Sequence, residues 1–171
     1  MPVTYTPRLE RLVQTVMVDV NTSLQLAVNR AARETHTLAR NTLRNRYALS
    51  DRYIDDRLSV SLSVTPTGAA EVSTVRKGTA LEHYNATRAA EGISVYVLRS
   101  SGRKTIRGSF TGRLRGGGDR QAIFRREGEG RGKLKRLYGP APFQWMRANL
   151  DMLAEYGAQQ GQQAMLHGGP L

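Results

Sequence analysis

The residues of this sequence that could do chemistry are few, and their spacing matches no familiar catalytic or metal site. The histidines are His36, His83 and His167, and no two of them have the i, i+4 spacing that presents two imidazoles to one metal ion. The chain has no cysteine, which excludes thiol catalysis, disulfides and cysteine-bound metals. From these residues we expect neither metal binding nor catalysis.

A cluster of aspartates invites a second chemical interpretation. Asp51, Asp55 and Asp56 could hold a cation or act as paired carboxylates. The sequence Ser50-Asp51, however, is also a typical start of a helix, where an acidic side chain favours the helix dipole. We therefore expect a short helix at residues 51–56 rather than a site.

Two glycine-rich segments could in principle cradle a phosphate. They lie at residues 116–118 and 128–132, and neither has the lysine followed by serine or threonine of a P-loop. The second precedes a basic, strand-like stretch instead of a helix N-terminus. We expect both to be hairpin tips, and we expect a protein that is not an enzyme and carries no cofactor.

The charge of the chain is concentrated in one segment. Residues 99–136 contain 13 lysines and arginines and three acidic residues, so this segment carries +10 of the formal net charge of +12. Arginine outnumbers lysine 22 to 4, which favours forked contacts to carboxylate or phosphate groups. Such a patch is typical of surfaces that bind nucleic acid or an acidic protein, and charge alone does not separate the two.

The element expected to support this patch is a long N-terminal helix over residues 8–49. Apolar or small residues recur every three or four positions from Leu9 to Leu43, and neither Gly nor Pro interrupts the segment. A break near Asn21 is the alternative. Because a helix of this length exceeds what a small domain uses, we expect part of it to contact another subunit.

Residues 57–137 are predicted to form an antiparallel β meander of four to six strands. The clearest strand is at residues 58–65, where Leu and Val alternate with Ser and Thr and predict one buried face. Residues 70–75 would pair with it as a hairpin. The apolar run at residues 93–98 is typical of a central strand.

The meander would end in a basic hairpin, followed by a C-terminal helix. Strands are predicted at residues 105–114 and 121–126, and the helix at residues 141–166. The chain length suits a single domain, residues 1–171. The predicted fold class is therefore α+β.

Most candidate binding residues lie in or beside the basic hairpin. The charged residues expected to contact a partner or DNA are Arg113, Arg115, Arg120, Arg125, Arg126, Arg131, Lys133 and Arg136. The residues expected to anchor the hairpin against the helices are Phe110, Phe124, Leu137, Tyr138 and Pro140.

Three interpretations of the basic hairpin remain open at this point. It could bind duplex DNA through phosphates, dock on an acidic protein ring, or be a solvated charged surface. Few aromatic residues lie among the arginines, so a stacking platform for single strands is not expected. A helix-turn-helix over residues 31–58 is disfavoured because its second helix would present aspartates to phosphate.

The sequence also carries expectations about location. The N-terminus lacks the basic start and apolar run of a signal peptide. No stretch approaches the roughly 18 consecutive apolar residues of a membrane span. We expect a soluble protein made in a cytoplasm, without a membrane partner.

Several motifs resemble those of the bacteriophage minor tail protein Z family, the lambda-like tail completion proteins. They are Gly108-Ser-Phe110, Ile123-Phe-Arg-Arg-Glu-Gly128, Leu137-Tyr-Gly-Pro140, the segment Leu26-Ala-Val-Asn29-Arg30 and the segment Ile54-Asp-Asp-Arg57-Leu58. The resemblance covers about residues 20–145. The chain departs from the family pattern at Ala141, where serine is common.

The resemblance implies a virion structural protein at the head-proximal end of a long tail. Such a protein would assemble as a ring, expected to be a hexamer, and would support head–tail joining. Its implied partners are tail terminator, tail tube or head–tail connector proteins, with non-specific contact to genomic DNA in the lumen. The resemblance transfers no catalytic residue. The alternative function is a basic, non-specific DNA-binding protein.

Overall fold

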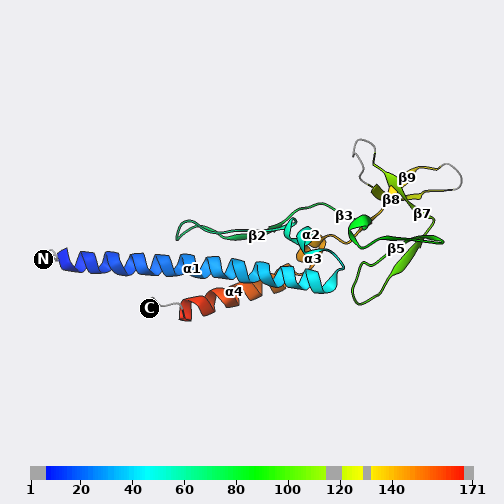
Figure 1. Ribbon diagram of the computed structural model, residues 1–171. Coiled ribbons are helices and arrows are strands. Elements are labelled where there is room, and N and C mark those ends of the chain that lie inside the picture. The colour runs from blue at the N-terminus through cyan, green and yellow to red at the C-terminus, as the bar shows by residue number, and fades with distance from the viewer. Residues whose placement is uncertain (1–6, 115–120, 129–131, 168–171) are drawn as a thin grey trace. The chain divides into compact units, whose positions relative to one another are not determined.

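The computed structural model describes residues 7–114, 121–128 and 132–167, with side chains from residue 14 onward. Over these residues the fold is α+β, as predicted, with a long N-terminal helix, short antiparallel strands and C-terminal helices (Figure 1). The strands differ from the predicted meander of four to six. The described residues form ten short strands in four small sheets.

The chain divides into two compact units, each described here by itself. The first comprises residues 1–37, 60–73 and 151–171, and the second comprises residues 38–59 and 74–150. The single domain expected from chain length stays a prediction.

Helix α1 (Pro7–Arg46) is one uninterrupted helix, so the alternative of a break near Asn21 is wrong. It ends three residues before the predicted residue 49. Beyond Arg46 the chain pairs with residues 97–99, since the Ala48 N–H donates to the Val97 carbonyl (3.0 Å). The Arg99 Nε caps the helix end by donating to the carbonyl oxygens of Arg44 (2.8 Å) and Tyr47 (3.2 Å). These carbonyls lie at the helix end, where they have no intrahelical partner.

In the first unit, a hairpin of β1 (Leu58–Ser61) and β2 (Glu71–Thr74) docks on α1. Asn29 fixes the contact, since its Oδ1 accepts from the Ser63 backbone N–H (2.7 Å) and its Nδ2 donates to the Ser63 carbonyl (3.0 Å). The prediction that the strand continues to residue 65 is wrong. The alternation of burial fails at Ser63, which is buried, while Val64 is 89% exposed.

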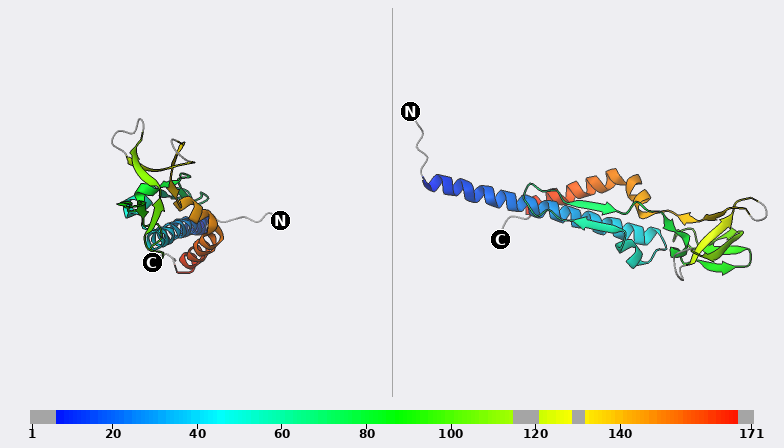
Figure 2. Two further views of the ribbon diagram at one scale, coloured as in Figure 1. Left: turned by 90° about the vertical axis from the view of Figure 1, so that its right-hand side faces the viewer. Right: turned by 90° about the horizontal axis from the view of Figure 1, so that it is seen from above.

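Helix α4 (Leu150–His167) runs alongside α1 in the first unit (Figures 1 and 2). Gly157 and Gly161 lie at the contact. A Cβ on Gly157 would come within 2.9 Å of the Thr35 hydroxyl, and one on Gly161 would meet the Ala31 methyl at 3.7 Å. Gly157 therefore allows the two helices to approach closely, whereas a methyl group at position 161 would make only an ordinary contact.

The C-terminal helix predicted at residues 141–166 is two helices, α3 (Pro142–Ala148) and α4. The break falls at Asn149, whose backbone leaves helical geometry and whose Nδ2 donates to the Trp145 carbonyl (2.7 Å). Asparagine side chains compete in this way for helix carbonyls. Sequence periodicity alone did not detect the interruption.

In the second unit, α2 (Asp51–Asp55) begins as predicted, with the Ser50 hydroxyl accepting from the Tyr53 N–H. Its aspartates pair with arginines of α1. Arg40 makes a two-pronged contact to Asp55 (2.5 and 2.9 Å), and Arg44 lies 3.2 Å from Asp51. The aspartate cluster thus stabilises the packing of α2 on α1.

The other strands of the second unit form three small sheets. One has the order β4–β5–β6, a second has the order β7–β8–β9, and β3 pairs with β10. The bounds are β3 (Thr79–Ala80), β4 (Thr87–Ala89), β5 (Gly92–Val95), β6 (Lys104–Arg107), β7 (Ser109–Arg113), β8 (Gln121–Arg126), β9 (Leu134–Arg136) and β10 (Tyr138–Gly139), with a 3₁₀ turn, η1, at Leu81–His83. β5 is central in its sheet, as predicted.

The strand predicted at residues 105–114 is divided into β6 and β7, which belong to different sheets. Gly108 lies between them with a φ of 68°. This left-handed backbone conformation is readily adopted by glycine and turns the chain from one sheet into the next. The core of the unit includes Leu43, Ile54, Tyr84 and Ile123, all less than 2% exposed.

Candidate interaction surface

The basic candidates that the structure describes lie on or beside the β7–β8–β9 sheet. β8 is its central strand, with Phe124 opposite Phe110 on β7 and opposite Arg136 on β9. Because neighbouring residues of a strand point to opposite faces, this register decides which cations can act together.

The register separates residues that were expected to form one charged contact. Arg113 and Arg125 belong to one face, and Arg126 and Arg136 belong to the other. The register thus places them on two faces, and their expected role in a charged contact stays a prediction. Lys133 is exposed just before β9. Arg115, Arg120 and Arg131 lie outside the described residues.

Two cations lie directly opposite each other on the neighbouring strands β8 and β9. Arg125 pairs in register with Lys135, a residue that the sequence analysis did not select. Lys135 has a carboxylate partner, Glu127, at 2.9 Å. Like charges opposite each other destabilise a strand pair, and both side chains are exposed. Glu127 already offsets the charge of Lys135, so an incoming anion would act mainly on Arg125.

The phenylalanines expected to anchor the hairpin pack on the sheet itself, and their expected contact with the helices stays a prediction. The rings of Phe110 and Phe124 lie 6.3 Å apart, centroid to centroid. The Phe124 ring also covers Gly112, where an added Cβ would lie 3.2 Å from it. The Arg126 guanidinium lies over the Phe110 ring at 5.8 Å, which is a cation–π distance.

The motif Leu137-Tyr-Gly-Pro140 joins this sheet to the core of the second unit. The Leu137 N–H donates to the Ile123 carbonyl (2.9 Å), and the Leu137 carbonyl accepts from the Leu81 N–H (3.3 Å). The Tyr84 hydroxyl donates to the Pro140 carbonyl. Tyr138 is 55% exposed, its ring lies 5.3 Å from the Arg136 guanidinium, and its expected role as an anchor stays a prediction.

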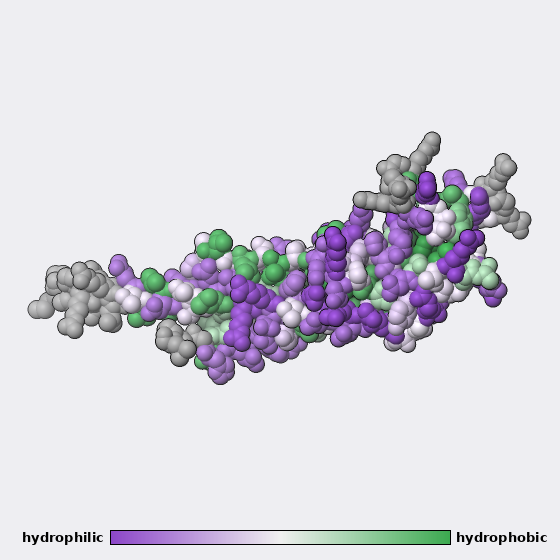
Figure 3. All heavy atoms as spheres, viewed as in Figure 1, coloured by the Kyte–Doolittle hydropathy of each residue, from purple (hydrophilic) through white to green (hydrophobic). Residues whose placement is uncertain are grey.

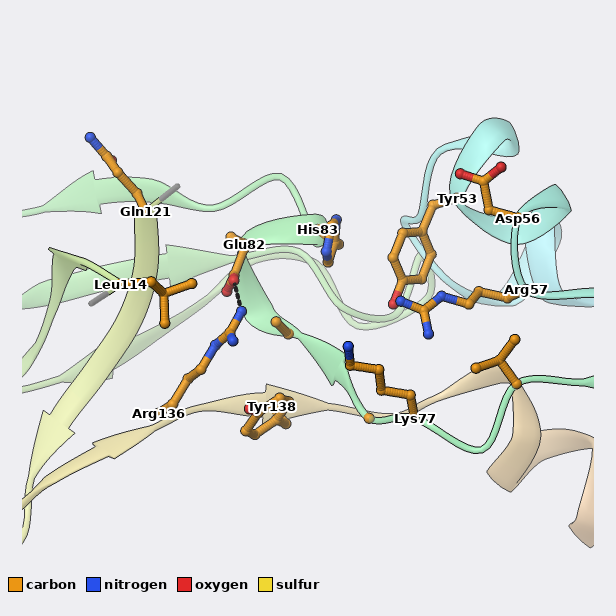
Figure 4. A pocket seen from close by; sticks show the side chains of 13 residues that line it. Tyr53, Asp56, Arg57, Lys77, Glu82, His83, Leu114, Gln121, Arg136 and Tyr138 are labelled. Carbon is orange, nitrogen blue, oxygen red and sulfur yellow. Dashed lines mark hydrogen bonds and ion pairs between the residues drawn. The ribbon is translucent and has the colours of Figure 1, made fainter. Parts of the chain in front are cut away.

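Beside this motif is a hollow of about 730 Å³ within the second unit. Its charged lining residues are Asp56, Arg57, Lys77, Glu82 and Arg136, and Figure 4 shows them with the aromatic residues nearby. Arg136 forms an ion pair with Glu82. Although burial opposes it, the hydrogen bond and charge of Glu82 raise the pKa of Arg136 above its usual value. Arg136 thus has a carboxylate partner of its own.

His83 forms the aromatic wall of the hollow together with Tyr53, at a ring distance of 4.3 Å. Partial burial lowers the pKa of His83; the charge of Glu82 opposes this change, and Arg57 and Arg136 add to it. The neutral form of His83 is thus favoured relative to a free histidine. The hollow has no local sequence signal, because its lining residues come from segments far apart in the chain.

Neither a metal-binding cluster nor a membrane-spanning helix is found among the described residues. In the part of the chain that the structure describes, no three His, Cys, Asp or Glu side chains gather as a metal site. Within the same residues, no helix has the length and hydropathy needed to cross a membrane. The expectation that the chain is not an enzyme stays a prediction.

Comparisons with known proteins add no family. The sequence matches no protein-family model and no curated protein, and the structure matches no solved structure. The resemblance to tail completion proteins thus depends on the quoted motifs alone and stays a hypothesis.

Proposed function

We propose that this chain is a non-enzymatic structural protein of a long-tailed bacteriophage virion. It completes the tail at its head-proximal end, assembles as a ring through α1, and presents the β7–β8–β9 sheet to a tail or head–tail connector protein. A hexamer is the expected ring, given the six-fold symmetry of long tails.

The observation that carries the proposal is the uncovered apolar surface of α1. Val16, Val20 and Leu24 are spaced by four residues and are 53%, 57% and 36% exposed. Farther along the helix, Ala27 and Ala32 are buried. Figure 3 shows apolar side chains at the surface in this part of the molecule. A surface helix with such residues is typical of subunit packing.

The basic sheet supports the second half of the proposal. Arg125 and Lys135 are exposed and directly opposite each other, an arrangement that favours a negatively charged partner. The same cations support the alternative, a basic protein that binds duplex DNA without sequence preference. The two functions predict different behaviour of the isolated protein, namely self-association in the first case and salt-dependent DNA binding in the second.

Light scattering with and without duplex DNA tests the proposal. We expect a closed oligomer, or a monomer that assembles only on tails, with weak DNA binding at moderate salt. A DNA-bound monomer or dimer whose affinity falls steeply with salt would favour the alternative.

A joining assay tests the role of the sheet. Heads and tails lacking this protein are mixed with purified protein and scored as infectious particles. We expect Arg125→Glu to lower joining by about tenfold or more, since it reverses a charge at the contact. The control is Lys104→Glu on β6, an exposed cation outside the β7–β8–β9 sheet. Equal joining by both variants would remove the sheet from the mechanism.

A further inference from the structure

We propose that the hollow between η1, β3, β10 and Arg57 binds an acidic side chain of a protein partner, within a short segment that also carries apolar residues. The inference relies on the proposed function only for the source of that partner. The chemistry of the site comes from the residues that line it.

Two cations of the hollow have no acidic partner among the described residues. Lys77 is exposed, and no carboxylate lies within ion-pair distance of its ammonium or of the Arg57 guanidinium in that part of the chain. The Arg57 guanidinium lies 4.9 Å from the Tyr53 ring, which holds its position. In Figure 4, both side chains point into the space between Tyr53 and the Glu82–Arg136 pair. This geometry would bind one oxyanion between two cations.

The charge of the lining suits a single carboxylate better than a phosphate backbone. Arg136 is neutralised by Glu82, and the Asp56 carboxylate points away from Lys77 in Figure 4. Arg57 and Lys77 are then opposed by one acid, leaving a small positive excess. A nucleic-acid strand would bring a row of phosphates past Asp56, whereas Arg57 and Lys77 supply the charge to bind only one of them.

The remaining lining favours a peptide. Val75 and Tyr138 are 47% and 55% exposed, and both line the hollow together with Leu114. Apolar side chains beside the acidic residue would cover them and exclude water from the ion pair. The volume of about 730 Å³ accommodates several side chains.

The test uses the full chain and a blocked peptide, Gly-Leu-Glu-Leu-Gly, with its glutamine counterpart Gly-Leu-Gln-Leu-Gly. NMR follows the imidazole signals of His83, assigned with His83→Gln. A carboxylate bound beside Arg57 would offset the field of the cations, so the glutamate peptide should raise the pKa of His83. We expect binding about tenfold weaker for the glutamine peptide.

Two double variants test whether the peptide binds in the hollow. Arg57→Gln combined with Lys77→Gln should weaken the glutamate peptide by about tenfold or more. The control, Arg88→Gln combined with Lys104→Gln, removes two exposed cations of the same unit outside the hollow and should leave binding unchanged. Equal losses in the two double variants would overturn the assignment.

A 20-base-pair duplex and inorganic phosphate complete the test. Larger shifts of the His83 signal with either one than with the glutamate peptide would contradict a peptide site, as would no shift with any ligand. Self-association of the same samples is measured in parallel. A peptide that binds a chain which forms rings neither alone nor when tails are added keeps the hollow and rejects the proposed function, whereas rings without peptide binding do the reverse.

Discussion

Gly139 shows how one residue type can be required by its neighbours. A Cβ at this position would lie 2.6 Å from Cε2 of Tyr84 and 3.3 Å from a methyl group of Leu81. Tyr84 cannot move away easily, because it is fully buried and its hydroxyl donates to the Pro140 carbonyl. The Tyr-Gly-Pro sequence is thus a packing requirement, in addition to being a motif.

Replacing this glycine should destabilise the chain. We expect Gly139→Ala to lower the free energy of unfolding by about 1–3 kcal/mol, the usual cost of overpacking, measured by urea denaturation. Gly161→Ala is the matched control, since its Cβ would make only an ordinary contact with Ala31. A helical Gly→Ala change without strain should stabilise by roughly 0.5–1 kcal/mol. A Gly139→Ala variant as stable as the wild type would contradict the packing account.

His83 gives a pH dependence with a defined sign. Its pKa in the folded chain is lowered from the ordinary value of 6.5, mainly because of partial burial. The charge of Glu82 opposes this change, and the cations Arg57 and Arg136 add to it. Below pH 6.5 the unfolded chain therefore binds a proton that the folded chain resists. The stability associated with a neutral His83 is present above this pH and is lost as pH falls.

The measurement compares urea midpoints at pH 7.5 and pH 5 for the wild type and His83→Gln. We expect the wild type to lose more stability than the variant over this interval. Identical losses would show that His83 does not couple protonation to folding.

At the scale of elements, apolar periodicity in the sequence predicted most of the helices and strands. It did not predict the positions at which a single residue ends or divides one of them. The long helix, α2 and β8 follow directly from apolar spacing, from Ser50 and from a short apolar run. The end of β1, the division at Gly108 and the break at Asn149 depend on one backbone conformation or one side-chain hydrogen bond each. Apolar spacing carries no signal for such contacts.

The candidate site shows the same limit. Sequence selected the arginines of β8, yet it could not assign Arg125 and Arg126 to opposite faces without the register of β7 and β9. It also could not pair Arg136 with Glu82, because 54 residues separate them. The hollow combines residues from distant segments and has no local pattern.

Asn29 on α1 holds the β1–β2 hairpin on that helix through its hydrogen bonds to the Ser63 backbone. We expect Asn29→Ala to destabilise the β1–β2 hairpin, since the buried Ser63 N–H would lose its acceptor, at a cost of about 1–3 kcal/mol. Gln25→Ala should cost less, because the Ser63 carbonyl keeps its bond from Asn29. Hydrogen exchange over residues 58–74 measures both variants. The reverse order of protection would contradict this account of docking.

At the scale of the whole molecule, α1 carries an apolar stripe that the chain covers only in part. Ala27, which shares the face of Val16 and Val20 at about 3.6 residues per turn, is buried, whereas the preceding turns leave Val16 and Val20 exposed. Asp19 is the one charged residue between residues 14 and 29. A helical segment with so few charges gains little from solvation and gains more by packing against a like helix.

Self-association should therefore depend on one face of α1. We expect Val16→Gln combined with Val20→Gln to shift the chain toward the monomer in sedimentation velocity, because both side chains leave a shared apolar stripe. The matched control is Val18→Gln combined with Leu26→Gln, which changes two residues of similar exposure, 62% and 63%, on another face of the helix. If both pairs of changes dissociate the oligomer equally, the contact is not a defined helix face. If neither does, α1 is not the element through which subunits assemble, and the ring would have to form through the second unit.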